Sequence, residues 1–234
     1  MQNTKTGILS LLSEDDYISG ARLAADLGVS RTAIWKNIQR LKDDGYNITA
    51  VTNKGYKLLE KSAYINESLL KKAVEQSALY DSLIYKETID STQNHAFRIL
   101  DQDDGNMVIV SGQQTEGRGR FKREWLSPKG AGLYMSLVLR PNVEHQQMIV
   151  FNLFMSLAIS EAIREAAGLK SGIKWPNDIF INDKKVCGFL TEVISTDNIV
   201  NTIVCGIGIN IEQSADTAAL GTATALQSEL GDEP

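Results

Sequence analysis

The chain has 234 residues, enough for one large domain and a small one, since domains cluster at about 100–150 residues. Its composition, 43% hydrophobic and 23% charged, is ordinary for a soluble globular protein. The net charge of −5 excludes a global basic field, so any DNA binding has to come from a local patch. Cys187 and Cys205 each lie in an apolar run, and two cysteines make neither a disulfide framework nor a zinc quartet, so we expect reduced core thiols.

The chain shows no targeting or membrane segment. Residues 1–5 are polar and no apolar signal region follows them, which favours a cytoplasmic protein. The most apolar stretch, residues 148–159, is interrupted by Asn152 and Ser156, and a bilayer span needs about 20 apolar residues. We interpret this stretch as a buried helix and expect no membrane partner. Residues 231–234 are expected to form no element.

Residues 5–60 predict three short helices followed by a hairpin. Ser19 is a candidate cap for the second helix, Gly28 breaks it, and Ser30 can cap the third. The third helix has one apolar stripe with spacings of 4 and 3, formed by Ile34, Ile38 and Leu41. Residues 48–51 and 56–59 then form a hairpin around a turn at 52–55.

Two helices joined at a tight glycine turn, with a cationic outer face on the second, are typical of a helix-turn-helix, and the hairpin of its wing. The residues expected to contact DNA are Ser30, Arg31, Thr32, Trp35, Lys36, Gln39 and Lys54. The alternative is a small docking module with solvated lysines, because acidic residues nearly offset the basic ones over this region.

After a polar junction at 61–66, helices and strands alternate. Helices are predicted at 68–77, 92–100 and 148–167, and strands at 84–88, 107–113, 133–139, 179–181, 185–194 and 202–211. The strands at 179–181 and 185–194 form a hairpin around Asn182-Asp183. The fold class is therefore α/β, of the α+β kind with a mixed sheet. We expect two domains, at residues 1–61 and 66–234.

The first candidate site lies at residues 90–94, DSTQN, between a strand and a helix. Its hydroxyls and amides could bind a polar ligand head. The alternative is helix capping by Asp90 or Ser91.

The second candidate site is the segment 113–125, QQTEGRGRFKREW, directly after a strand. Glycines allow the backbone to approach a ligand closely, and arginines offer planar forks for phosphate or carboxylate. The spacing of a P-loop is absent. The alternative, a solvated basic loop, explains the two glycines and Trp125 poorly.

The third candidate site is KWPND at residues 174–178, followed by KKVCG at residues 184–188. A Trp-Pro turn would hold Lys174 rigidly, and Asp178 could meet a metal ion. GIGIN at 206–210 has two glycines, which a bulge or tight packing explains equally well. His95 and His145 are expected on the surface, and we find no nucleophile-base set or metal-ligand cluster in the sequence. The chemistry must then depend on positioning and positive charge, which suits phosphoryl or adenylyl transfer.

These motifs resemble those of the bifunctional biotin protein ligases, the BirA family, which also act as biotin operon repressors. The matching stretches, in the family's order, are SGARLAADLGVSRTAIWKNIQRL, NKGYKL, DSTQN, QQTEGRGRFKREWLSPKGAGLYMSL, KWPNDIFINDKKVCGFLTE and GIGINI. The resemblance implies a ligase that uses ATP and Mg²⁺ to convert biotin to biotinyl-5′-AMP. It then transfers biotin to a lysine of the biotin carboxyl carrier protein of acetyl-CoA carboxylase.

The resemblance also assigns roles by motif. Biotin-binding residues would be Ser91, Thr92, Gln93, Gln114, Arg118, Gly119, Arg120 and Lys174. ATP-binding residues would be Arg118, Arg120, Arg123, Trp125, Asn177 and Asn210. Lys174, Arg118 and Arg120 would be catalytic, Asp178 would meet Mg²⁺, and the arginine-glycine loop would close over the adenylate.

The family further implies a homodimer of the adenylate-bound form, which pairs sheets side by side and binds operator DNA. Two departures stand out. Gln93-Asn94 follows the DST motif where some members have Asn-Gln, and the small SH3-like C-terminal domain is expected to be absent. Two alternatives remain open: a lipoate ligase, and a transcription regulator that senses biotin without ligase activity.

Overall fold

A computed structural model of the chain describes residues 4–13, 16–43, 46–52, 54–60, 65 and 67–230. The chain divides into two compact units, Met1–Ser68 and Leu69–Pro234. The expected polar junction at 61–66 lies almost wholly outside the described residues, as do the last four residues, 231–234.

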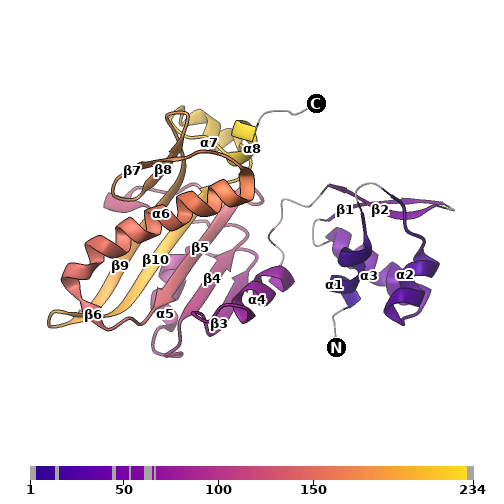
Figure 1. The fold of residues 1–234 in the computed structure, drawn as a ribbon, viewed down its shortest axis with the longest axis horizontal. Coiled ribbons are helices and arrows are strands. Elements are labelled where there is room, and N and C mark those ends of the chain that lie inside the picture. The colour runs from indigo at the N-terminus through magenta and orange to yellow at the C-terminus, as the bar shows by residue number, and fades with distance from the viewer. Residues whose placement is uncertain are drawn as a thin grey trace. The chain divides into compact units, whose positions relative to one another are not determined.

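The N-terminal unit is a three-helix winged fold (Figure 1). Its elements are α1 (Thr4–Leu11), α2 (Gly20–Leu27), α3 (Arg31–Asp43), β1 (Asn47–Val51) and β2 (Gly55–Glu60). The predicted caps are confirmed: the Ser19 hydroxyl accepts from the Arg22 N–H at 3.1 Å, and the Ser30 hydroxyl accepts from the Ala33 N–H at 3.1 Å. Gly28 ends α2 in the left-handed region at φ 64°. The predicted stripe of α3 is buried in the core of this unit.

The C-terminal unit is built on one mixed sheet. Its helices of five or more residues are α4 (Glu67–Glu75), α5 (Thr92–Ile99), α6 (Met148–Ala167), α7 (Ala215–Ala219) and α8 (Leu226–Leu230). Its strands are β3 (Ser82–Lys86), β4 (Met107–Ser111), β5 (Gly132–Leu139), β6 (Val143–Glu144), β7 (Gly172–Lys174), β8 (Asp178–Ile181), β9 (Lys184–Thr196) and β10 (Ile199–Asn210). The sheet order is β3-β4-β5-β10-β9-β8-β7, with β6 paired to β10. Among the strand pairs of the described sheet β3–β4 is parallel and the others are antiparallel, so the predicted mixed sheet is confirmed.

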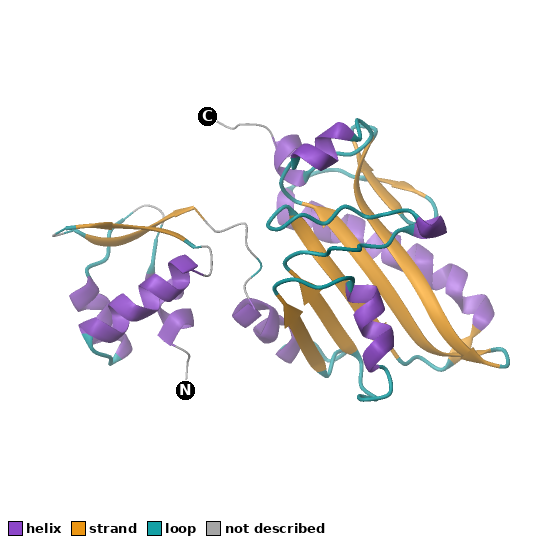
Figure 2. Ribbon diagram, turned by 180° about the vertical axis from the view of Figure 1, so that it is seen from behind, coloured by secondary structure: helices purple, strands orange, loops and turns teal. Residues whose placement is uncertain are grey.

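The strand register divides the sheet into two faces. Gly188, Leu190 and Glu192 of β9 lie opposite Gly208, Gly206 and Val204 of β10, and alternation places these six on one face. On that face α5 packs, since Ser136 of β5 donates to the Thr92 hydroxyl at 2.8 Å. The other face carries α6, whose Asn152 accepts a hydrogen bond from Thr191 at 2.8 Å. Figure 1 shows α6 across the near face, and Figure 2 shows α5 with the loops on the opposite face.

Helix α6 has the predicted bounds, but its predicted burial is wrong for much of its surface. Met148, Ile159 and Ile163 are buried, whereas Ile149 is 63% exposed and Phe154 69% exposed. The helix lies on the sheet and no described element covers its outer side, so only one stripe is buried. By length and composition alone residues His145–Ala167 could cross a membrane, but here they pack on the sheet.

Two further local predictions are confirmed. The turn between β8 and β9 is formed by Asn182 and Asp183, at φ 47° and 61°, as a two-residue hairpin requires. Cys187 and Cys205 are free buried thiols. Burial raises the pKa of the Cys205 thiol to about 12.

Candidate functional site

A cavity of about 200 Å³ lies on the α5 face of the sheet. Its lining joins the start of α5, the segment 118–125, the start of β8 and the facing stretches of β9 and β10. Ten residues that the sequence singled out meet here: Ser91, Thr92, Gln93, Gln114, Arg118, Gly119, Arg120, Arg123, Trp125 and Asn177, with Asp178 beside them. Segments far apart in the sequence therefore converge on one concave site.

One part of the cavity is a neutral hydrogen-bonding corner at the N-terminus of α5. The Gln114 carboxamide oxygen accepts from the Thr92 N–H at 2.8 Å and lies 3.1 Å from the Thr92 hydroxyl. The Gln114 amide nitrogen in turn donates to Ser127 at 2.8 Å. Ser91 also accepts from the Asn94 N–H at 3.4 Å, so the capping alternative describes part of its role. Ser91 is thus at once a cap and a cavity residue.

Gln93 forms the floor of this corner and is 3% exposed. Its amide nitrogen donates to the Glu192 carboxylate at 2.9 Å, to the Val204 carbonyl at 3.2 Å and to the Leu190 carbonyl at 3.4 Å. Its carboxamide oxygen is buried without a hydrogen-bond partner in the described structure. A Cβ at Gly206 would collide with that oxygen, which explains the first glycine of GIGIN. A buried unpaired acceptor is costly unless a ligand donor satisfies it.

The arginine-glycine segment folds back over the cavity. Trp125 N–H donates to the Gly117 carbonyl at 2.9 Å, and Gly119 N–H donates to the Arg123 carbonyl at 2.8 Å. Arg120 donates to the Asn177 side chain at 2.8 Å, which ties the segment to the start of β8. At the tip, Phe121 is 81% exposed and has a φ of 56°, a strained value for a bulky residue.

Trp125 packs against the two facing glycines of the sheet, Gly208 and Gly188. A Cβ at Gly208 would collide with the Trp125 ring, and one at Gly188 would lie 3.1 Å from the Trp125 Cζ3 atom. The second glycine of GIGIN is therefore explained by tight packing, one of the two explanations that the sequence left open. The Trp125 indole nitrogen is buried and has no partner in the described structure.

The lysine in the described cavity lining is Lys185, which belongs to the third candidate cluster but was assigned no role from the sequence. Lys185 Nζ lies 2.7 Å from Asp178 Oδ1 and 5.2 Å from the centre of the Trp125 ring. Lys174, the residue expected there, does not line the cavity, is exposed, and has Nζ 5.1 Å from the centre of the Phe180 ring. Lysines at the start of a strand are common, so the spacing alone carried no signal for Lys185.

Asn210 is likewise absent from the cavity lining. It is 7% exposed and donates to the Thr224 carbonyl at 3.0 Å. The neighbouring segment brackets Lys185: the Lys185 N–H donates to the Thr222 carbonyl and the Thr224 N–H donates to the Lys185 carbonyl, both at 2.9 Å. Asn210 thus holds the segment that pairs with the backbone of Lys185, and it does not line the cavity itself.

Asp90 lies at the edge of the site and takes a structural role. Its two carboxylate oxygens accept from Arg98 at 2.6 and 2.7 Å, and this pairing holds the pKa of Asp90 well below its usual range. The Asp90 carbonyl accepts from the Glu116 N–H at 2.8 Å, which joins the DSTQN segment to the base of the arginine-glycine segment.

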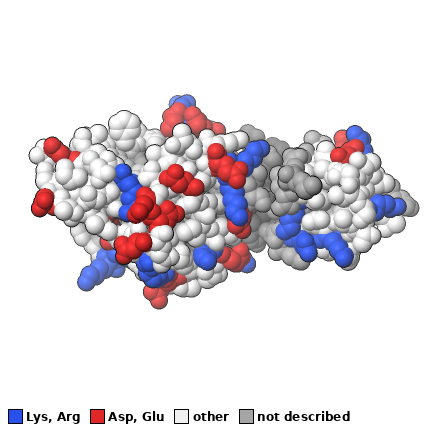
Figure 3. Space-filling view, turned by 90° about the horizontal axis from the view of Figure 1, so that it is seen from below, with Lys and Arg blue, Asp and Glu red and all other residues white. Residues whose placement is uncertain are grey.

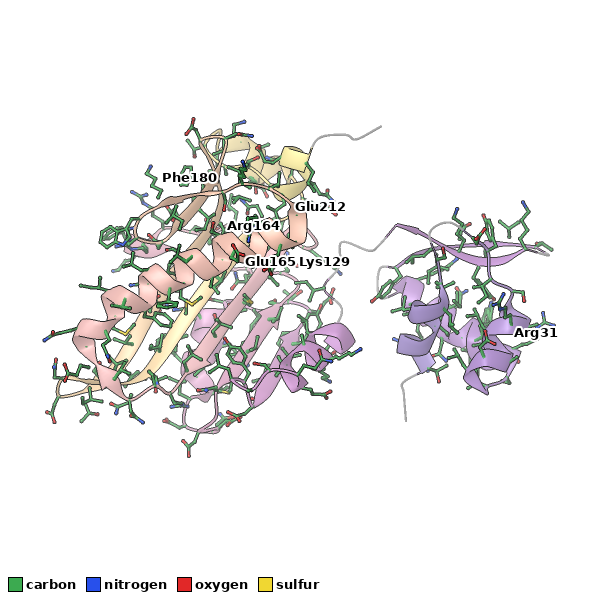
Figure 4. All side chains as sticks on the ribbon, in the orientation of Figure 1. Arg31, Lys129, Arg164, Glu165, Phe180 and Glu212 are labelled. Carbon is green, nitrogen blue, oxygen red and sulfur yellow. The ribbon has the colours of Figure 1, made fainter. Side chains whose placement is uncertain are left out.

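The N-terminal unit presents a groove between α3 and the hairpin. Arg31, Thr32, Trp35 and Lys54 line it, and all four are exposed. Lys36 is exposed, Gln39 is half-buried, and Ser30 uses its hydroxyl as a helix cap. Figure 3 shows more basic than acidic side chains on the visible face of this unit, and Figure 4 places Arg31 on its outer side. A local basic patch is present on a chain whose net charge is −5.

Comparison with known proteins shows which families the two units resemble. Residues 85–210 match the biotin/lipoate A/B protein ligase family, and residues 5–57 match a helix-turn-helix domain family. The chain is 40% identical over 210 residues to the bifunctional ligase/repressor BirA of Bacillus subtilis (strain 168), covering 88% of this chain and 64% of that protein. It is 34% identical over 205 residues to BirA of Escherichia coli (strain K12), covering 87% of this chain and 62% of that protein.

Among solved structures, the biotin protein ligase of Aquifex aeolicus in complex with biotin and ATP aligns with a TM-score of 0.56 and 34% identity. That alignment covers 65% of this chain and 62% of the other. The chain spans less than two thirds of the length of these curated relatives.

Proposed function

Because the chain belongs to the biotin/lipoate A/B protein ligase family, we propose that it activates biotin with ATP to biotinyl-5′-AMP. In a second step it transfers biotin to a lysine of the biotin carboxyl carrier protein of acetyl-CoA carboxylase. The observation that carries this proposal is one cavity that joins a neutral hydrogen-bonding corner to Arg120, Arg123 and Lys185.

The neutral corner suits the ring system of biotin, a cyclic urea with one carbonyl acceptor and two N–H donors. The unpartnered Gln93 oxygen needs a donor, and the Ser91 hydroxyl, whose oxygen accepts from Asn94, can donate to the urea carbonyl. Lipoate carries a dithiolane ring with no N–H donor, so it would leave these buried groups unpaired. A site built to hydrogen-bond its ligand rejects an analogue that lacks the matching groups.

The cationic part of the cavity suits the reacting groups. A carboxylate oxygen of biotin attacks the α-phosphorus of ATP, the bond to the bridging oxygen breaks, and pyrophosphate leaves. Lys185 is the cation that we assign to the reacting centre in place of Lys174, because it lines the cavity. Fixed cations that meet the developing charge are the main contribution a protein makes to such a step.

Asp178 holds Lys185 in the absence of substrate and is released when phosphate oxygens take its place. Mg²⁺ would arrive with ATP, since this ion is usually bound by one or two carboxylates and the substrate phosphates. Asp178 and Glu124 are the carboxylates of the described cavity lining that could hold it. When bound, Mg²⁺ neutralises charge on the pyrophosphate leaving group.

We also propose that the N-terminal unit binds operator DNA and that the chain is a biotin-operon repressor. The support is the winged fold with exposed Arg31, Trp35, Lys36 and Lys54. A helix-turn-helix dimer reads two half-sites, so repression needs a homodimer of the adenylate-bound form. In the described structure β9 beyond Phe189 is paired on one side only, by β10, and this open edge could pair with that of a second copy. We place this activity in the cytoplasm, consistent with two free buried thiols.

The test is pyrophosphate release with ATP and either biotin or lipoate, together with calorimetry of each acid. The proposal expects pyrophosphate release when ATP is combined with biotin and none when it is combined with lipoate. Pyrophosphate release with lipoate but not with biotin would favour a lipoate ligase. Tight biotin binding without pyrophosphate release would favour a regulator that only senses biotin. Binding of neither acid would reject the proposal.

A further inference from the structure

Glu192 connects the arginine-glycine segment to the cavity floor. It lies on the same face of β9 as Gly188 and Leu190, one step beyond the residues that line the cavity. One carboxylate oxygen accepts from Arg118 at 3.1 Å, and the other accepts from the Gln93 amide at 2.9 Å. One acidic side chain therefore contacts both the lid and the floor of the site.

We propose that Glu192 is a positioning residue: it keeps the segment 117–125 closed over the bound ligand and fixes which end of the Gln93 amide faces that ligand. The inference rests on the proposed function, because it assigns a role in holding biotin and its adenylate. Glu192 itself does not line the cavity, so it acts through Arg118 and Gln93.

The orientation of Gln93 follows from what a carboxylate can do. An ionised carboxylate only accepts hydrogen bonds, and so do the carbonyls of Leu190 and Val204 beside it. All three neighbours select the NH₂ end of Gln93, which turns the oxygen away from them. The oxygen is then left as a buried acceptor at the cavity, where an N–H donor of the ligand can satisfy it. Glu192, the charged one of the three, thereby reinforces the Gln93 orientation that distinguishes a urea ring from a ring without donors.

The closure of the lid depends on the same carboxylate. Arg118 divides its guanidinium between Glu192 and the Asn94 side chain, which accepts at 2.9 Å. Of these two partners only Glu192 is charged, and charge-assisted hydrogen bonds are the stronger kind. The second tie of the segment, Arg120 to Asn177, lies on the other side of the Gly119 position and is neutral on the Asn177 side. Loss of Glu192 therefore leaves the Arg118 end of the segment with its neutral hydrogen bond to Asn94 and leaves the Arg120 end unchanged.

The experiment measures release of biotinyl-5′-AMP by stopped-flow tryptophan fluorescence in wild type, Glu192→Ala and Glu161→Ala. Glu161 is a matched control, since it also pairs with an arginine, Arg164 on α6, but lies away from the cavity (Figure 4 labels Arg164). Glu192→Ala should release the adenylate roughly tenfold faster, as expected for one charge-assisted hydrogen bond. Release by Glu161→Ala should match wild type. A Glu192→Ala rate equal to that of the control would overturn the proposal.

A double-mutant cycle separates positioning from a general loss of structure. If Glu192 acts through Arg118, Glu192→Ala should add little to the increase in adenylate release rate caused by Arg118→Ala. If the two residues act independently, the two fold-changes in release rate would multiply. The biotin KM should rise in Glu192→Ala while the melting temperature stays close to that of Glu161→Ala. Multiplying effects, or an unchanged biotin KM, would contradict the role of Glu192.

Failure of the proposed function can be told apart from failure of this inference. If the wild type makes no adenylate, the function is wrong, and the lid is then tested without ligand by limited trypsin digestion. The segment offers cleavage sites at Arg118, Arg120, Lys122 and Arg123. Glu192→Ala should be cut there several-fold faster than wild type and Glu161→Ala. Equal cleavage of all three would overturn the tie between Glu192 and the lid.

Discussion

Lys185 and Asp178 form an ion pair of 2.7 Å inside the cavity, and each is less than one third exposed. The pair places one ammonium group within the cavity that also contains Arg120 and Arg123. Because the partner is a carboxylate rather than a backbone carbonyl, an incoming phosphate can replace it with a group of like charge. Under the proposed function, the pair would therefore hold the Lys185 ammonium in the site before the phosphate binds.

Lys185→Ala should reduce the rate of adenylate synthesis at least about 100-fold, because removal of one preorganised charge at a reacting centre typically costs that much. Lys174→Ala should change the rate only a few-fold, since Lys174 is exposed and outside the cavity. Pyrophosphate release measures both. The reverse ranking of the two variants would return the reacting centre to Lys174.

A β-bulge explains why Lys185 faces the cavity in this structure. Between β8 and β9 the register passes from Ile179 opposite Cys187 to Phe180 opposite Lys185, so β9 has one extra residue, Val186. Plain alternation would place Lys185 on the same face as Cys187, toward α6. The bulge reverses the side of Lys185 and brings it to the cavity. A register shift of this kind depends on pairing and leaves no signal in the spacing of side chains.

The features that sequence did predict are those set by local chemistry. Caps at Ser19 and Ser30, the left-handed turn at Gly28 and the hairpin at 182–183 each depend on one or two neighbouring residues. The exposure of the outer face of α6 was not predicted because apolar side chains occur on all sides of this helix. An apolar pattern of this kind predicts a helix that is buried on every side. Strand β7 was missed because its three residues carry no pattern.

The pairing of Asp90 with Arg98 predicts a pH dependence of stability. Because the folded-state pKa of Asp90 is depressed, its contribution is present above the ordinary pKa of about 4 and is lost as the pH falls through the folded-state value. In urea unfolding, the difference in free energy between wild type and Asp90→Asn should be constant from pH 5 to 7 and shrink below about pH 4. A difference that stays constant down to pH 2 would show that the pair does not act through charge.

Replacement of Arg31 and Lys36 together by Ala should weaken operator binding and leave adenylate synthesis unchanged. Each exposed cation that contacts a phosphate adds to affinity and to its salt dependence, so the loss should be at least about tenfold at 50 mM salt and smaller at 200 mM. A gel-shift series over salt measures it. As a control, Lys71→Ala with Lys72→Ala on α4 makes the same charge change outside the winged fold. Equal operator affinity of the two double variants would reject α3 as the DNA-recognition helix.

Gly208→Ala should damage the site while the fold survives. The added methyl group would collide with the Trp125 ring, which is the end of a side chain and can move, whereas the strand backbone cannot. Overpacking of this kind costs about 1–3 kcal/mol, so ATP should bind roughly ten times more weakly, and displaced Trp125 should emit at longer wavelength. Gly172→Ala on β7 is the control, because its Cβ would lie 3.9 Å from the nearest atom, the Phe180 carbonyl oxygen. Unchanged emission and ATP affinity in Gly208→Ala would show that Trp125 does not need this glycine.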